Sequence, residues 1–140
     1  MLVSMVLLPI LLVGYRSLIF TLSCELENGY KSTVSSIDVI NIPPQAGYYS
    51  VTPIGGTSLV TTFDFIASQW SDMDVPLSYE FGYITNNNLF LVLRLRITVA
   101  YDPSLLTSGI IDRNFTLNSR VQVYDSMGAS SYLDFEVRVK

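Results

Sequence analysis

Residues 117–140, LNSRVQVYDSMGASSYLDFEVRVK, alternate apolar and polar side chains on both sides of a short turn. The apolar residues of the two runs are Leu117, Val121, Val123, Leu133, Phe135, Val137 and Val139. Successive side chains of a β-strand point to opposite faces, so each run has one apolar and one polar face. Gly128 can adopt the positive φ that a tight turn needs. The stretch therefore predicts an antiparallel hairpin with one buried face.

The same alternation recurs upstream. Three further runs of apolar residues have it: Phe63, Phe65 and Ala67; Leu77, Tyr79, Phe81 and Tyr83; and Leu91, Leu93, Leu95, Ile97 and Val99. We expect each apolar set to face a core, and Arg94 and Arg96 to mark a solvent face. A series of half-buried strands over about 100 residues predicts an all-β fold, an antiparallel Ig-like or fibronectin-III-like β-sandwich of about seven strands.

A pair of prolines marks the start of this sandwich. The segment Asn41-Ile42-Pro43-Pro44 cannot continue a central strand and is typical of a stiff linker. Ile54-Gly55-Gly56-Thr57 and Asn86-Asn87-Asn88 are predicted to be turns between strands. We therefore predict one module over residues 43–140.

The segment before the prolines resembles the end of the module. Leu22-Ser23-Cys24, then Gly29, then Val39-Ile40 repeats the order strand, glycine turn, strand. We interpret residues 18–42 as the last hairpin of a preceding, similar module, which would leave it with an unpaired edge. Residues 1–17 form an apolar leader, either a signal-like segment in a helix or the start of a fragment that belongs to the earlier module as a strand.

Composition excludes several classes of function. There is no histidine, which removes Ser-His-Asp and Cys-His chemistry and the commonest transition-metal ligand. The single cysteine, Cys24, allows no intrachain disulfide and would by itself favour a reducing compartment. The net charge of −4 and the pI near 4.5 argue against a nucleic-acid partner. We predict a protein that is not an enzyme and has no cofactor.

Four features are candidate sites, and three of them have a structural alternative. Asp72 and Asp74 could bind calcium through carboxylate oxygens, or they could cap the turn in which they lie. Asn114 begins an Asn-Phe-Thr sequon for glycosylation in a secreted protein. Trp70 is expected in the core between the sheets, with a ligand platform as the alternative. The tyrosines, which suit interfaces, are also common in strands.

One motif resembles a known family. The chain has a Pro43-Pro44 opening, a strand ending at Pro53, a Phe63 to Trp70 strand, and then Asp72, Asp74 and a Pro-Leu-x-Tyr-x-Phe run that ends at Phe81. This pattern over residues 41–83 resembles the REJ (receptor for egg jelly) module of polycystin-like and protist surface proteins. Residues 84–116 carry little of it.

The resemblance also identifies a departure from the family. Such modules often carry a pair of cysteines where this chain has Tyr49 and Ala67. Both are missing together, so the resemblance implies that the two positions face each other. It also implies that the large ring fills the space left by the small residue.

What the resemblance implies about function is an extracellular or cell-surface module within a larger membrane-anchored protein. The expected role is adhesion or ligand interaction, with a passive structural spacer in a tandem array as the alternative and a carbohydrate-active accessory domain as a remote one. The expected partners are neighbouring modules of the same chain and a protein or carbohydrate ligand. Nucleic acid is not expected, and membrane contact is expected only through the parent protein. A binding module should expose a contiguous apolar or tyrosine-rich surface, whereas a spacer should be evenly polar.

Overall fold

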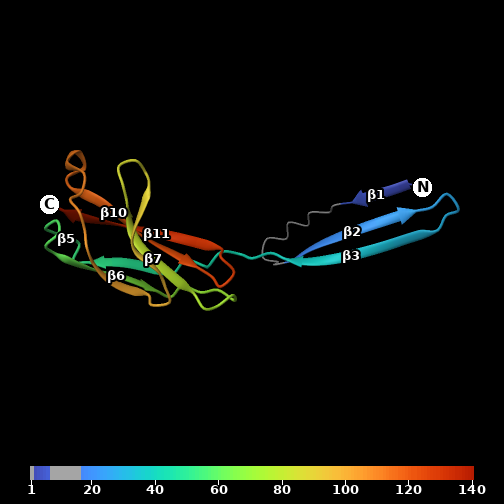
Figure 1. The fold of residues 1–140 in the computed structure, drawn as a ribbon, viewed down its shortest axis with the longest axis horizontal. Helices are drawn as coiled ribbons and strands as arrows, with labels where there is room; N and C mark the ends of the chain where they lie inside the picture. The colour runs from blue at the N-terminus through green and yellow to red at the C-terminus, as the bar shows by residue number, and fades with distance from the viewer. Residues whose placement is uncertain (1, 7–16) are drawn as a thin grey trace. The chain divides into compact units, whose positions relative to one another are not determined.

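The computed structural model describes residues 2–6 and 17–140 (Figure 1). The chain divides between Ile42 and Pro43 into two compact units, each described here by itself. None of the helical structure in the described ranges is long and apolar enough to cross a membrane.

The first unit is a three-stranded antiparallel sheet with the order β1-β2-β3. Its strands are β1 (Leu2–Val6), β2 (Ser17–Glu25) and β3 (Lys31–Val39). Gly29 has a φ of +81° in the turn between β2 and β3, which confirms the predicted strand, glycine turn and strand. Residues 2–6 are a strand, and the rest of the predicted leader, residues 7–16, lies outside the described residues. The assignment of this hairpin to a preceding module stays a prediction.

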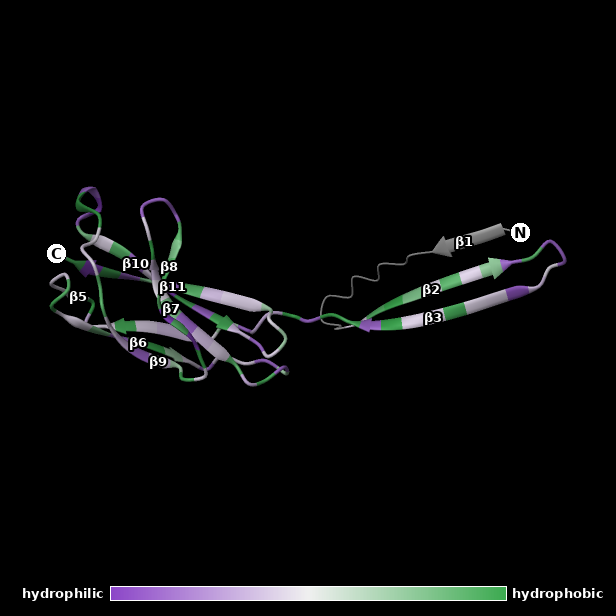
Figure 2. Ribbon diagram, viewed as in Figure 1, coloured by the Kyte–Doolittle hydropathy of each residue, from purple (hydrophilic) through white to green (hydrophobic). Residues whose placement is uncertain are grey.

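The strands β2 and β3 of this first unit bury little of their surface. Every residue of β3 is exposed, and the bands of hydrophobic and hydrophilic residues along it are visible in Figure 2. Val34, Ile37 and Val39 are each more than 60% exposed. The described residues of this unit form one small sheet, and a sheet buries such residues only against a second layer.

The second unit consists of two sheets. Its strands are β4 (Tyr48–Thr52), β5 (Gly55–Gly56), β6 (Thr62–Ser68), β7 (Ser78–Ile84), β8 (Phe90–Ile97), β9 (Tyr101–Leu105), β10 (Thr116–Tyr124) and β11 (Ser130–Val139). A short 3₁₀ helix, η1 (Ile111–Arg113), precedes β10. One sheet has the order β4-β6-β9 and the other β5-β11-β10-β7-β8. Antiparallel pairing holds throughout, except that β5 pairs in parallel with β11.

The core lies between these two sheets and confirms the predicted β-sandwich. The three-stranded sheet contributes Phe63 and Phe65, and the five-stranded sheet contributes Phe81, Val121 and others, all fully buried. The Phe65 and Phe81 rings stack with centroids 6.0 Å apart. Both sheets pair strands that are far apart in the sequence, such as β7 with β10 and β6 with β9.

Two of the three predicted turns are confirmed, and the third is confirmed in part. Gly128, with a φ of +95°, closes the β10–β11 hairpin as expected, and Asn88, with a φ of +59°, lies in the β7–β8 turn. The predicted turn at Ile54 to Thr57 is only partly a turn, because Gly55 and Gly56 form β5 and pair with Arg138 and Val139.

The prediction for β8 was wrong in its burial. Alternation predicted one buried face for residues 91–99, but Leu91 is 41%, Leu95 76% and Val99 56% exposed. β8 is the edge strand, and its register against β7 shifts between Tyr79 and Gly82. A register shift interrupts the alternation of inward and outward side chains. An edge strand is also less well covered by the opposite sheet than a central strand.

Candidate functional site

The outer face of the β4-β6-β9 sheet carries very little charge. Its outward residues, placed by strand register and burial, are Tyr48, Ser50, Thr52, Thr62, Asp64, Ile66, Ser68, Tyr101, Pro103 and Leu105. We call this surface the low-charge face. Tyr48 is 66%, Ile66 40% and Tyr101 44% exposed, and Ile66 lies directly opposite Tyr101. The face therefore combines exposed aromatic and aliphatic groups with serine and threonine hydroxyls.

Asp64 is the one carboxylate among these outward residues, and it already accepts a hydrogen bond. The Tyr101 hydroxyl donates a hydrogen bond to Asp64 Oδ1 over 2.8 Å. This hydrogen bond to the carboxylate raises the pKa of Tyr101, so the hydroxyl is neutral at physiological pH. The pair fixes one tyrosine of the low-charge face in position without adding an unsatisfied charge.

The outer face of the five-stranded sheet differs sharply. It presents Glu80, Arg120, Asp134, Glu136 and Arg138. Arg120 binds both carboxylate oxygens of Asp134, at 2.6 and 2.9 Å, and its guanidinium lies 3.7 Å above the Tyr132 ring. We call this surface the charged face. Its groups largely satisfy one another, as on an ordinary solvated surface.

Behind the low-charge face, Tyr49 lies directly opposite Ala67, which confirms that the two positions face each other. The Tyr49 ring is buried, meets the Phe135 ring edge-on and hydrogen-bonds through its hydroxyl to Ser119 of the other sheet. Burial raises the pKa of the Tyr49 phenol well above its ordinary value, so the phenol stays protonated. A hydrogen-bonded ring thus connects the two sheets through the core.

Trp70 belongs to the core, as predicted. It is 9% exposed, and its indole Nε1 donates to the Tyr48 carbonyl oxygen over 3.3 Å. The alternative of a surface platform is therefore excluded for this residue. Its hydrogen bond instead holds the backbone at the start of β4, where the exposed Tyr48 begins the low-charge face.

The structure brings Asp72 and Asp74 together with a third acid. One carboxylate oxygen from each of Asp72, Asp74 and Asp125 lies within 4.8 Å of the others. Asp72 Oδ1 also accepts the Asp74 amide over 2.8 Å, which is the turn-capping role considered from the sequence. Asp125 lies where the sequence predicts the short turn of the hairpin. No local pattern joins it to the other two, because the β6–β7 loop and the β10–β11 hairpin meet only in the fold.

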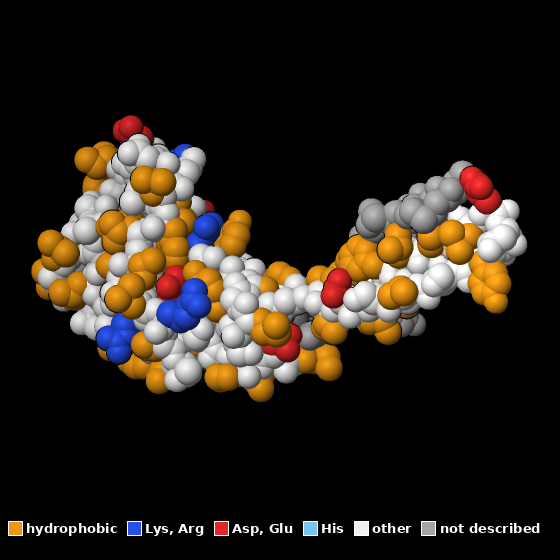
Figure 3. All heavy atoms as spheres, turned by 45° about the vertical axis from the view of Figure 1, so that its right-hand side comes forward, with side chains coloured by type: hydrophobic (Ala, Val, Ile, Leu, Met, Phe, Trp, Pro, Cys, Tyr) orange, Lys and Arg blue, Asp and Glu red, His pale blue; other side chains and the backbone are white. Residues whose placement is uncertain are grey.

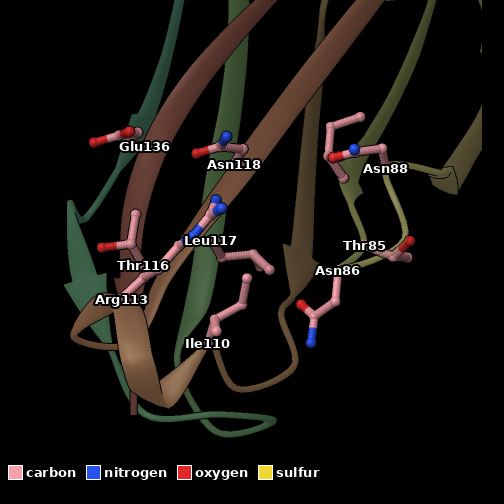
Figure 4. A pocket seen from close by; sticks show the side chains of 10 residues that line it. Thr85, Asn86, Asn88, Ile110, Arg113, Thr116, Leu117, Asn118 and Glu136 are labelled. Atoms are coloured by element: carbon pink, nitrogen blue, oxygen red, sulfur yellow. The ribbon is translucent and has the colours of Figure 1, made fainter.

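At the other end of β7 and β10 there is a small polar hollow of about 200 Å³ (Figure 4). Ile110 and Leu117 point toward each other within it, and Asn118, Arg113 and Glu136 supply polar groups. This volume is below the roughly 300 Å³ at which small-molecule sites begin. Asn114, the predicted glycosylation site, is exposed directly after η1, and its modification stays a prediction.

Comparison with known proteins places this sequence among receptor modules. The family model described as "REJ domain" matches residues 12–140, which extend over both units. The chain is 31% identical over 115 residues, or 74% of its length, to a protein of Homo sapiens named "Polycystin family receptor for egg jelly". It is 26% identical over 123 residues, or 80% of its length, to the protein of that name from Mus musculus.

The match covers 5% of the human protein and 6% of the mouse protein, so the chain spans only a small part of its curated relatives. The family is found in receptor-type proteins and is not a known enzyme family. The chain therefore belongs to the REJ domain family.

Proposed function

We propose that this chain is an extracellular, non-catalytic interaction module of a larger surface receptor-like protein, and that it contacts its ligand through the low-charge face. The observation that carries the proposal is the difference between the two outer faces of the sandwich. One face is charged and internally paired, whereas the other exposes Tyr48, Ile66 and Tyr101 among hydroxyl groups. Hydrophobic side chains are also exposed elsewhere on the molecule (Figure 3), including Ile19, Val34 and Ile37 of the first unit.

The composition of the low-charge face supports contact with a protein surface. Protein interfaces are depleted of charge at their centre and enriched in tyrosine, which buries area and keeps a polar group. Tyrosine and serine together are also the main residues of antibody contact surfaces. The names of the relatives describe receptors for egg jelly, so we propose a component of egg jelly as the ligand.

The alternatives receive less support. A passive spacer in a tandem array would have no reason to keep one face poor in charge. A carbohydrate-active domain would need two carboxylates across a cleft. The polar hollow contains one, Glu136. The role of residues 18–42 as the last hairpin of a preceding module is retained as part of the proposal, and the neighbouring modules of the parent protein are further partners.

Binding of the 140-residue chain to solubilised egg jelly, measured by surface plasmon resonance, tests this function. We expect Tyr48→Ser and Tyr101→Ser each to weaken binding by about five- to thirtyfold, because truncating an interface tyrosine typically costs about 1 to 2 kcal/mol. The matched control is Tyr132→Ser, which removes an exposed tyrosine from the charged face and should leave the affinity unchanged.

Two results would contradict the proposal. Absence of binding by the unmodified chain would favour the spacer. Equal loss in all three variants would show that the low-charge face has no special role.

A further inference from the structure

One buried carboxylate oxygen in the sandwich lacks a partner. Asp125 is 3% exposed. Its Oδ1 accepts the backbone amides of Met127 and Ala129, each over 2.9 Å, and so closes the hairpin. Its Oδ2 is buried and has no hydrogen-bond partner among the residues that the structure describes. Burial of an ionised carboxylate is costly unless the charge is paired with a cation or coordinates a metal.

Two neighbouring carboxylates raise the energetic cost of a negative charge on Asp125. Asp72 and Asp74 each place a carboxylate oxygen within 4.8 Å of the Asp125 carboxylate. Three carboxylates at such distances repel one another, and partial burial strengthens the repulsion. A divalent cation among them would remove the repulsion and give Asp125 Oδ2 its missing partner.

We propose that Asp72, Asp74 and Asp125 bind one calcium ion. Calcium is a hard cation that takes six to eight oxygen ligands in a flexible arrangement, and carboxylates can each supply one or two. Three carboxylates with water molecules satisfy that requirement. Magnesium demands near-octahedral geometry and gives up its water reluctantly. The softer transition metals, such as copper and zinc, prefer nitrogen or sulfur ligands, which these three side chains do not offer.

The loop and the hairpin that hold the three acids are already joined by their backbones. The Ser126 amide donates to the Asp74 carbonyl oxygen over 2.9 Å, next to two of the proposed ligands. This contact brings Asp74 and Asp125 together before any ion binds. The site therefore requires only side-chain adjustment, and calcium should stabilise the loop against the hairpin.

The site also lies beside the start of the second unit. Gln45 pairs with Ser71, the residue before Asp72, through hydrogen bonds of 2.9 and 3.3 Å. Ser131, just beyond the hairpin, donates to the Pro44 carbonyl oxygen over 2.6 Å. Calcium would thus strengthen the end of the sandwich at which its polypeptide begins, away from the polar hollow at the other end of β7 and β10.

Calorimetric titration of the chelator-treated 140-residue chain with calcium chloride tests the proposal. We expect one site with a dissociation constant of roughly 10⁻⁴ to 10⁻³ M, the range of extracellular calcium modules, and much weaker binding of magnesium. Asp72→Asn and Asp125→Asn should each weaken calcium binding at least about tenfold, because each removes one of three charged ligands. Calcium should also raise the unfolding temperature of the unmodified chain, because it binds only the folded state.

The matched control is Asp112→Asn, which removes one exposed carboxylate from η1 and should leave calcium binding unchanged. If Asp125→Asn fails to fold because its hairpin is weakened, Asp72→Asn decides the question. Absence of calcium binding by the unmodified chain at millimolar concentration would overturn the proposal. Full binding by Asp72→Asn would also overturn it, as would magnesium binding as tight as that of calcium.

Discussion

Individual side chains, rather than a covalent cross-link, connect the two sheets of this sandwich. Tyr49 of β4 lies directly opposite Ala67 of β6 in the three-stranded sheet. The Tyr49 ring continues past Ala67 into the core, where its hydroxyl meets Ser119, a fully buried residue of β10. Burial of the ring and one hydrogen bond thus connect the two sheets through the core.

Removal of this hydrogen bond should lower the stability of the chain, mainly because a buried hydroxyl is left without a partner. We expect Tyr49→Phe to lower the free energy of unfolding by about 1 to 3 kcal/mol, because the buried Ser119 hydroxyl loses its partner. The double variant Tyr49→Phe/Ser119→Ala should recover part of that loss, since no unpaired polar group remains. Urea unfolding at an unchanged m-value measures both effects. A stability of Tyr49→Phe equal to that of the unmodified chain would contradict this role of the hydrogen bond.

Some of these residues could be predicted from the sequence and others could not. Ser119 lies two residues from both Leu117 and Val121, so its inward position follows from the period of two along the strand. The facing of Tyr49 and Ala67 follows from the resemblance. The contact between Tyr49 and Ser119 joins two sheets, so no local pattern contains it. The same limit hid Asp125 as a neighbour of Asp72, because the loop and the hairpin come together only when the sandwich closes.

At the scale of elements, alternation predicted the central strands well and the edge strand poorly. β6 and β10 bury every second residue because each has a neighbouring strand on both sides and one face against the core. β8 has a neighbour on one side only, and its register against β7 shifts near Gly82. Periodicity in the sequence records the two faces of a strand but not its place in the sheet.

Gly82 allows β7 and β8 to approach closely, which gives an element-scale prediction. A Cβ atom at this position would lie 2.0 Å from the Leu91 carbonyl oxygen. We expect Gly82→Ala to destabilise the chain by about 3 kcal/mol, because the β8 backbone would have to move. Thermal unfolding followed by circular dichroism measures the change.

Gly55→Ala is the matched control, since its added Cβ would meet the nearest atom, the Arg138 carbonyl oxygen, at 3.3 Å. It replaces a strand glycine where the clash is slight and should cost much less. Equal destabilisation by the two variants would show that loss of backbone freedom, and not the approach of β8, explains the effect.

At the scale of the whole molecule, the second unit combines a sandwich with two chemically different outer faces. The charged face satisfies its own groups through contacts such as Arg120 with Asp134 and Tyr124 with Glu80. The low-charge face exposes apolar area that folding leaves unburied. Exposed apolar surface has a cost in a soluble module unless it serves an interaction, and this difference favours a contact surface over a uniform spacer.

Hydroxyl-radical footprinting of the 140-residue chain, with and without solubilised egg jelly, tests this central claim most directly, because it reports the exposure of individual side chains. The account predicts that egg jelly reduces oxidation of Tyr48 and Tyr101 on the low-charge face and leaves oxidation of Tyr132 on the charged face unchanged. Protection of Tyr132 with no change at Tyr48 and Tyr101 would contradict it, as would no protection at any of the three.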